Sequence, residues 1–219
     1  MRIDGKIDPL ILGLLLLLAG GIIYAVIALQ PKPATEPPLA LQSATLLPEL
    51  RSLPPFSLVD QQGRAYDNRR LQNHWTLLSF GYTHCPDICP TSLAMLAQMK
   101  QQLQQKGMQD PYEIAFVSVD PERDTPQQLG EYVAYFDPDF LGLTGTPSAI
   151  EELARPLGIL YRKVITEGSA MDYVMDHSAS MVLLDPQGRY RALFSPPHDA
   201  AMMAQDILAI SQGAEGETK

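Results

Sequence analysis

Residues 75–90 read WTLLSFGYTHCPDICP and carry the strongest structural signal in this chain. The first six residues of the stretch are mostly apolar and predict a buried strand, and apolar residues after Pro90 recur at helical spacing. A proline is tolerated in the first turn of a helix, because no backbone N–H is missed there. Cys85 and Cys89 therefore lie between a strand end and a helix start. Open α/β sheets place their binding sites at this kind of junction.

Strands and helices alternate on both sides of this stretch. Turn-forming residues at 60–63 follow an alternating strand, which predicts an N-terminal hairpin. The pattern predicts strands at 56–59, 75–80, 114–119, 141–143, 159–164, 180–184 and 190–194, and helices after Cys89 and at 125–135, 146–157 and 199–210. Such alternation gives a central sheet with helices on both faces. The closing antiparallel hairpin and helix complete a thioredoxin-like plan, so the predicted fold class is α/β.

An uncharged apolar run at 10–29 predicts a single transmembrane helix ahead of this domain, since about 20 apolar residues span a bilayer core. A cleaved signal peptide is the alternative, but its apolar region is shorter, about 7–15 residues, and ends at a small-residue cleavage site. The predicted organisation is a short leader at 1–9, the membrane helix at 10–29, a Pro-rich linker at 30–45, a thioredoxin-like domain at 46–212 and a flexible tail at 213–219.

Basic residues around the apolar run predict its orientation. Arg2 and Lys6 precede the run, and only Lys32 follows it closely, so the positive-inside rule places the N-terminus in the cytoplasm. The leader is too short, and too poor in Arg and Ser, for a mitochondrial transit peptide. The expected location is therefore the bacterial inner membrane, crossed once, with the domain in the periplasm.

Composition excludes several classes of protein. The net charge of −9 disfavours nucleic acid as a partner, because phosphate contacts need Lys and Arg. Hydrophobic residues make up 46% of the chain, enough for a proper core. The chain has only 2 cysteines, which excludes both a disulfide-stapled scaffold and a four-cysteine zinc ribbon. Two cysteines this close together indicate a local site.

Cys85 and Cys89 are separated by three residues rather than the two of an ordinary thioredoxin motif. Either spacing can close a disulfide, but the longer loop can also turn both sulfurs toward a third group. A helix N-terminus lowers the pKa of a thiol and makes the thiolate available as nucleophile or metal ligand. The nearby carboxylates of Asp87 and Asp176 oppose that shift. The spacing alone leaves disulfide exchange and metal binding open.

A third ligand is expected in the segment that precedes the closing hairpin, because that loop faces the cysteines in a thioredoxin plan. His177 lies there. Thioredoxin oxidoreductases place a cis-proline at this point, whereas this chain has no proline between Pro156 and Pro186. Two thiolates and one imidazole favour Cu(I), and can hold Cu(II), while zinc usually takes a fourth ligand or keeps an open catalytic position. The pattern favours metal at Cys85, Cys89 and His177 over general disulfide exchange.

Three segments of the chain resemble the SCO/SenC family of copper chaperones and thiol oxidoreductases for cytochrome c oxidase assembly. They are FGYTHCPDICP at 80–90, SVDPERDTP at 118–126 and DHS at 176–178. The resemblance covers roughly 53–210 and implies one copper ion per chain, Cu(I) or Cu(II), held by Cys85, Cys89 and His177. It also implies delivery of copper to, or thiol reduction of, the dinuclear copper site of oxidase subunit II. A periplasmic copper donor and a thiol reductant would be further partners.

Two functions remain open. A copper-binding assembly factor needs His177, whereas a periplasmic thiol–disulfide reductase independent of copper needs only the redox-active pair Cys85 and Cys89. A metallochaperone is expected rather than an enzyme, and a peroxide-reducing enzyme is disfavoured because it would need a lone activated thiol. Candidates for supporting roles are His84, Asp120, Arg123, Asp124, Met171 and Met175, while His74 and His198 are expected at the surface or at caps.

Overall fold

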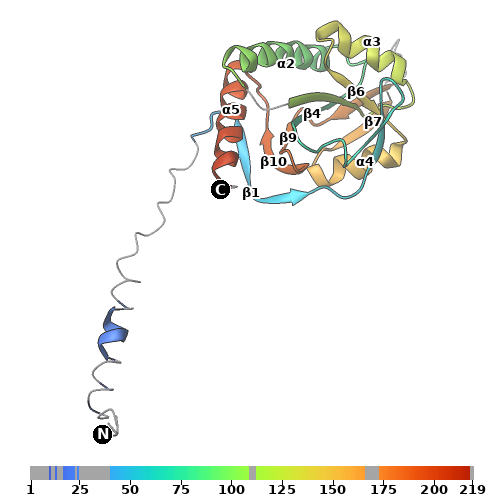
Figure 1. Ribbon diagram of the computed structural model, residues 1–219. Coiled ribbons are helices and arrows are strands. Elements are labelled where there is room, and N and C mark those ends of the chain that lie inside the picture. Colours follow the sequence, from blue (N-terminus) through green and yellow to red (C-terminus); the bar gives the residue numbers. More distant parts are fainter. Residues whose placement is uncertain are drawn as a thin grey trace. The chain divides into compact units, whose positions relative to one another are not determined.

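A computed structural model describes residues 40–108, 112–165 and 173–217, together with Leu10, Gly13, 17–22 and Tyr24. The chain divides into two compact units, Met1–Pro38 and Leu39–Lys219. Figure 1 shows the second unit as a sheet covered by helices.

The predicted membrane helix at 10–29 lies mostly outside the described residues, as do the predicted leader and most of the predicted linker. Residues 17–22 are helical. Within the described positions, no helix is both long enough and apolar enough to cross a membrane. The membrane span therefore stays a prediction from the sequence.

Eight described strands form the central sheet of the second unit, in the order β1-β10-β9-β4-β5-β6-β2-β3. Strand β4 pairs in parallel with β5, and β5 with β6, while the other neighbours run antiparallel. The strands are β1 (Ala44–Ser52), β2 (Ser57–Asp60), β3 (Ala65–Asp67), β4 (Trp75–Gly81), β5 (Tyr112–Ser118), β6 (Leu141–Thr144), β9 (Met181–Leu184) and β10 (Arg189–Phe194). The predicted N-terminal hairpin is β2–β3, and the closing hairpin is β9–β10.

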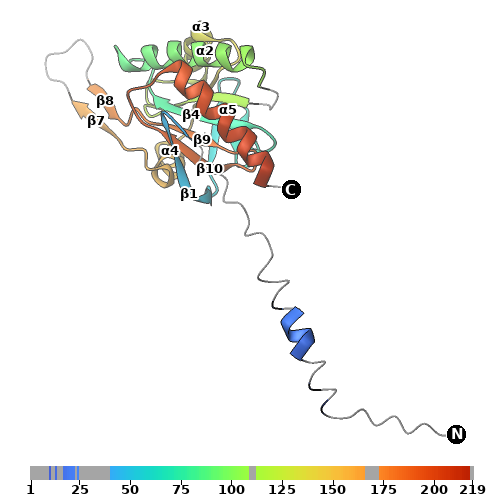
Figure 2. The ribbon, with the colours of Figure 1, turned by 90° about the vertical axis from the view of Figure 1, so that its left-hand side faces the viewer.

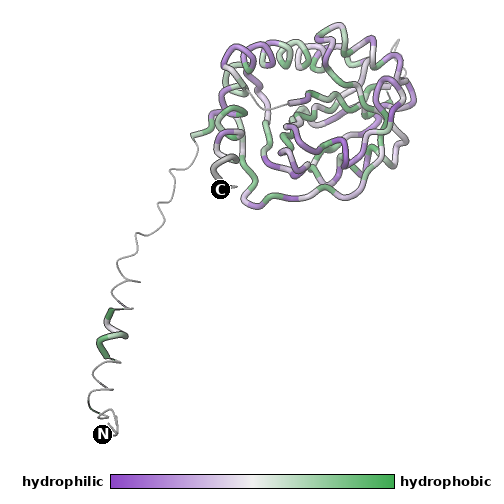
Figure 3. Tube along the Cα trace, viewed as in Figure 1, coloured by the Kyte–Doolittle hydropathy of each residue, from purple (hydrophilic) through white to green (hydrophobic). Residues whose placement is uncertain are grey.

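Helices cover both faces of this sheet, as predicted. They are α2 (Ile88–Gln105), α3 (Pro126–Phe136), α4 (Pro147–Ala154), a 3-10 turn (Arg155–Leu157) and α5 (Ala200–Glu217). Apolar side chains of α2, α3 and α5 form one core cluster, and those of α4 belong to a second cluster. Figure 3 shows hydrophobic residues concentrated along the central strands and mixed with hydrophilic ones along the outer helices.

Strand β4 lies in the middle of the main sheet. All 7 of its residues are buried, because helices cover both faces of the sheet at this position. Strands β4 and β5 end side by side, with Gly81 opposite Ser118. The loops that follow these two strands therefore leave the sheet at the same edge.

Helices α3 and α4 begin at capping residues that can be recognised in the sequence. Thr125 forms a capping box with Gln128 at the start of α3, and the Thr146 side chain accepts a hydrogen bond from the backbone N–H of Ala149 in α4. A proline follows each cap, where its fixed backbone torsion suits the first helical turn.

The structure differs from the sequence prediction at three places. Strand β1 begins at Ala44, inside the predicted linker, and pairs with the sheet edge at β10. The predicted strand at 159–164 is β7 (Tyr161–Ile165), which pairs not with the main sheet but with β8 (Tyr173–His177) in a two-stranded sheet. Figure 2 shows β7 and β8 at one side of the domain. Helix α5 continues to Glu217, through most of the predicted tail, because Ser211 is buried and Ala214 packs on the core.

A buried carboxylate fixes the start of β1. Asp206 of α5 accepts hydrogen bonds from the backbone N–H groups of Gln42, Ser43 and Ala44, at 2.7–3.1 Å. It also accepts one from the Ser43 hydroxyl at 2.8 Å. The beginning of the domain is thereby attached to its last helix.

Replacing Asp206 with alanine is expected to lower the free energy of unfolding by about 1–3 kcal/mol, because the half-buried backbone donors of Ser43 and Ala44 lose their buried acceptor. Urea denaturation of the purified chain measures this effect. The matched control is Glu152→Ala on the exposed face of α4, where a change within about 0.5 kcal/mol is expected. Equal midpoints for the two variants would contradict the role given to Asp206.

Candidate metal centre

The two cysteines stand on either side of a helix start. Cys85 lies in the loop after β4, and its backbone N–H donates to the Tyr82 carbonyl at 3.2 Å. Helix α2 begins at Ile88, so Cys89 lies in its first turn. Cys85 is partly exposed and Cys89 is buried, and both are free thiols. The more accessible sulfur is therefore that of the loop cysteine.

His177 is the last residue of β8, paired with Tyr161 of β7, and not a loop residue as predicted. Its Nδ1 lies 3.1 Å from the Ser178 carbonyl, which can only accept a hydrogen bond, so Nδ1 carries the proton. Its Nε2 faces Cys89 Sγ at 3.5 Å. The ring stands edge-on to Tyr82, with centroids 6.0 Å apart. A backbone acceptor at one imidazole nitrogen leaves the other free as a ligand.

The two sulfurs and an imidazole nitrogen of His177 all lie within 4.8 Å of one another. In the described part of the chain, no other group of three or more His, Cys, Asp or Glu side chains is placed to hold a metal ion. The structure thus brings together the three residues that the sequence singles out. Two sulfur donors with one imidazole form a soft donor set, which suits copper better than hard cations.

Hydrogen bonding makes the two cysteines electrostatically unequal. The Cys89 thiol donates to Cys85, and this contact, with a smaller contribution from His177, lowers the pKa of Cys85 to about 3 against the opposing effect of burial. The same bond and burial raise the pKa of Cys89 far above its usual range. Cys85 is therefore the thiolate of the pair.

The negative charge of the Cys85 thiolate also affects the pKa of His177. Burial lowers the pKa of its imidazole, but contact with Cys85 and the bond to the Ser178 carbonyl outweigh burial, and the pKa lies above its ordinary value. The histidine and Cys85 stabilise each other's charged forms when no metal is bound. A metal ion would take the place of the protons that these groups share.

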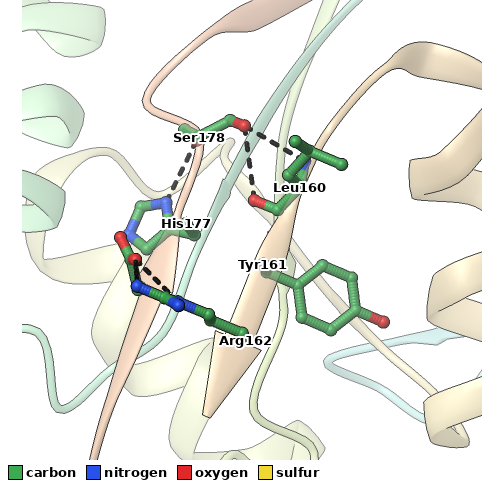
Figure 4. Close-up of a pocket in the computed structure, with 6 residues that line it drawn as sticks. Leu160, Tyr161, Arg162, His177 and Ser178 are labelled. Carbon is green, nitrogen blue, oxygen red and sulfur yellow. Dashed lines mark hydrogen bonds and ion pairs between the residues drawn. The ribbon is translucent and has the colours of Figure 1, made fainter. Parts of the chain in front are cut away.

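Two open pockets meet at His177. One, of about 540 Å³, lies between the cysteine loop and the β7–β8 hairpin and is lined by Cys85, Ile88, Val164 and Met175 among others. The second, of about 350 Å³, is lined by residues 160–162 and 176–178. Figure 4 shows Ser178 bonded to Leu160 beside the His177 ring. Cys85 and His177 thus face a pocket that opens to solvent, whereas Cys89 lies buried behind them.

Asp124 holds the cysteine loop in place. Its buried carboxylate accepts hydrogen bonds from the Thr83 backbone at 3.0 Å, the Thr83 hydroxyl at 2.6 Å and the Ser118 hydroxyl at 2.6 Å. His84 points to this cluster, with Nδ1 3.0 Å from the Thr83 hydroxyl, and takes no part in the three-residue group. Asp124 therefore supports the site by shaping the loop before Cys85.

The remaining candidates lie around the site. Met175 packs against both core clusters and lines the larger pocket. The His198 Nε2 donates to the Ala179 carbonyl at 2.8 Å, close after β8, whereas His74 lies beside Glu113 at the far end of β4. Met171 lies outside the described residues. Asp120 and Arg123 both contact Tyr173, at the start of β8.

Sequence reasoning missed one residue that shapes the site, Gly81. A Cβ at this position would lie 2.6 Å from Cys89 Sγ and 2.7 Å from the Phe116 ring. Only glycine therefore lets Cys89 approach the end of β4. A glycine at the junction of a buried strand and a CxxxC segment was the available signal.

Gly81→Ala is expected to displace the Cys89 sulfur and weaken copper binding about tenfold or more, the scale of changes next to metal ligands. Gly142→Ala is the matched control, because its Cβ would lie 2.9 Å from Leu129 but away from the site. Both variants should lose about 1–3 kcal/mol of stability through overpacking. Competition titration with a Cu(I) chelator distinguishes them. Equal copper affinities in the two variants would refute the role of Gly81.

The chain is similar in sequence to known proteins. The curated "Protein SCO1 homolog 1, mitochondrial" of Arabidopsis thaliana is 40% identical over 154 residues, which make up 70% of this chain and 45% of that protein. The "SCO2-like protein RP587" of Rickettsia prowazekii is 34% identical over 194 residues, 89% of this chain and 92% of that protein. The chain thus spans less than half of the first relative and nearly all of the second.

Solved structures show the same fold. The crystal structure of Arabidopsis thaliana ScoI with copper bound matches with a TM-score of 0.68 and 38% identity, and covers 73% of this chain and 98% of that one. The mixed α/β, thioredoxin-like fold predicted from the sequence is confirmed for the second unit. The family model described as SCO1/SenC matches residues 46–212. The chain therefore belongs to the SCO1/SenC family.

Proposed function

We propose that this chain is a copper-binding protein of cytochrome c oxidase assembly that holds one copper ion through Cys85, Cys89 and His177. The observation that carries the proposal is the convergence of two sulfurs and one imidazole nitrogen within 4.8 Å. Thiolate and imidazole ligands suit Cu(I), and a site open to solvent suits a cargo that must be passed on. The copper-bound Arabidopsis relative supports the choice of metal.

We infer that the protein delivers copper to, or reduces the cysteines of, the dinuclear copper site of cytochrome c oxidase subunit II. BsSco, which has a disulfide switch, is a member of the Sco family of cytochrome c oxidase assembly proteins, which supports this assignment. The apolar run at 10–29 and the basic residues before it support a single-pass anchor in the bacterial inner membrane with the domain in the periplasm.

A deletion strain tests the proposal. Oxidase activity is measured at low and at added copper after restoring the wild-type chain, His177→Ala, Cys85→Ser or the control His74→Ala, whose ring lies at the far end of β4. We expect the wild type and the control to restore activity at low copper and the two site variants to fail. Full activity of His177→Ala at low copper would overturn the copper-delivery proposal.

A second candidate, thiol–disulfide reduction, is favoured by the lowered pKa of Cys85 beside the buried Cys89. The Cys85 thiolate would attack a disulfide of the partner, forming a mixed disulfide and releasing one partner thiolate. The Cys89 sulfur would then attack Cys85, closing the Cys85–Cys89 disulfide, and the Cys89 thiol proton would pass to the second partner sulfur as it leaves. The two electrons go from the cysteine pair to the partner, and an external thiol reductant restores the pair. A bound copper ion and this disulfide compete for the same sulfurs.

A further inference from the structure

The third ligand lies on an element that does not belong to the main sheet. His177 ends β8, which pairs only with β7 among the described strands, whereas the cysteines follow β4 and enter α2. A two-stranded hairpin has little stability of its own in water. The position of the His177 ring relative to the two sulfurs therefore depends on contacts that hold β8 against the rest of the domain.

The loop between β5 and α3 makes such contacts with Tyr173, the first residue of β8. The Tyr173 hydroxyl donates to the buried Asp120 carboxylate at 2.8 Å. Arg123 Nη1 donates to the Tyr173 backbone carbonyl at 3.2 Å, and its Nε donates to Asp120. The guanidinium also covers the Tyr173 ring, 3.7 Å from the ring centroid. Both the side chain and the backbone of Tyr173 are thus held by two residues of one loop.

The contacts of Arg123 with Asp120 and Tyr173 fix the orientation of these groups as well as attracting them. A buried ion pair contributes little net stability compared with apolar residues of similar volume, because both charges lose their hydration. A guanidinium, however, is planar and donates in fixed directions, so it determines the orientation of the groups that it binds. Arg123 also lies 5.6 Å from the Tyr82 ring, which itself stands edge-on to His177. Arg123 therefore contacts the first residue of β8 and the residue that flanks the imidazole.

We propose that Arg123, oriented by Asp120, is a positioning residue for the metal site: it fixes β8 so that the His177 imidazole lies within reach of both cysteine sulfurs. The proposal rests on the copper site proposed above. Arg123 touches no donor atom and acts through the strand that carries one. The same loop also holds Thr83, two residues before Cys85, through the Asp124 carboxylate.

A double-mutant cycle tests this inference. Copper affinity is measured on variants of the full chain, with copper alone as the probe. We expect Arg123→Ala to weaken copper binding about tenfold, the lower end of the effect of residues that orient metal ligands. In a His177→Ala background, Arg123→Ala should cause no further loss, because the group that it positions is absent. A merely structural role would lower the affinity equally in both backgrounds, and that outcome would overturn the proposal.

The matched control is Arg189→Ala at the start of β10. Arg189 donates from Nε to the buried Asp185 carboxylate at 2.7 Å, as Arg123 does to Asp120, but it lies in the closing hairpin and lines neither pocket at His177. Unchanged copper affinity is expected for this variant. A loss as large as that of Arg123→Ala would show that removing any guanidinium paired with a buried carboxylate has the same effect, and would contradict the assignment.

Spectroscopy gives a second readout that does not depend on affinity. In the Cu(II)-loaded chain, Arg123→Ala should weaken the imidazole nitrogen coupling in the electron paramagnetic resonance spectrum and leave the sulfur-to-copper absorption in place. If Arg123→Ala fails to fold, Arg123→Lys replaces it, because it keeps a positive charge beside Asp120 and removes the planar guanidinium that donates to the Tyr173 carbonyl. Unaltered nitrogen coupling in the tested variant would refute the proposal. A wild-type chain that loads no copper would instead refute the copper site itself.

Discussion

Replacing His177 with alanine is expected to weaken copper binding by more than about 100-fold, since loss of a residue that only orients a ligand already costs about 10–100-fold. The imidazole supplies the single nitrogen of the three-residue group, and its Nε2 faces Cys89 Sγ at 3.5 Å. Competition titration of the reduced chain with a Cu(I) chelator measures the loss. His198→Ala is a suitable control, because that histidine bonds to the Ala179 carbonyl and, among the described residues, is not part of the group that could hold a metal ion.

The same His177→Ala variant separates the two candidate functions. Disulfide reduction needs only the sulfurs of Cys85 and Cys89, so reduction of a peptide disulfide should persist when the imidazole is removed. A copper affinity within threefold of the wild type would exclude His177 as a ligand. Loss of disulfide reduction together with copper binding would instead show that the two activities share the imidazole.

Cys85 in the reduced, copper-free chain is expected to react with an alkylating agent at nearly the same rate from pH 5 to pH 8. Its pKa of about 3 keeps it ionised over this whole interval, whereas an ordinary thiol near pKa 8.5 would lose about 1000-fold in reactivity between pH 8 and pH 5. The thiolate is the reactive form, so reactivity falls only as the pH drops through the folded pKa. The absolute rate stays modest, because nucleophilicity falls with pKa.

Cys89→Ala is the informative variant for this prediction. It removes the hydrogen bond that contributes most to the lowered pKa of Cys85, so the pKa should rise and the rate should begin to fall at a higher pH than in the wild type. Cys85→Ala should abolish the pH-independent reaction, because Cys89 is buried and its pKa is raised. Mass spectrometry of the alkylated peptide identifies the modified sulfur. A steep pH dependence in the wild-type chain would show that the thiol bond to Cys85 is not formed in solution.

Local patterns predict most of the domain. Strand β4, the start of α3 at Thr125 and the closing hairpin follow from apolar runs, caps and turn residues that lie within a few positions of one another. The placement of His177 opposite the cysteines follows from the order of these elements. Strand β1 could not be predicted in this way, because its sequence is polar at several positions and it forms through pairing with β10 and contact with Asp206, both distant in sequence.

The details of the site depend on three-dimensional proximity. Gly81 is needed because a Cβ there would lie 2.6 Å from the Cys89 sulfur, and its place between a buried strand and the cysteines hints at such a close approach without showing which atom is near. Tyr173 belongs to a short strand whose partner is the equally short β7, so a period-based prediction leaves it as a loop. Its contacts with Asp120 and Arg123 join positions about 50 residues apart.

The separate β7–β8 sheet has a consequence for how a metal ion could leave. Local unfolding of a small hairpin needs less free energy than opening of an eight-stranded sheet, and amide hydrogen exchange should accordingly be faster in β8 than in β4. The ligands are divided between these two regions. The sulfurs lie at the edge of the eight-stranded sheet, and the imidazole lies on the β7–β8 hairpin. Transient detachment of the hairpin would leave an ion on two sulfurs with one position vacant for an incoming ligand, while the core stays folded.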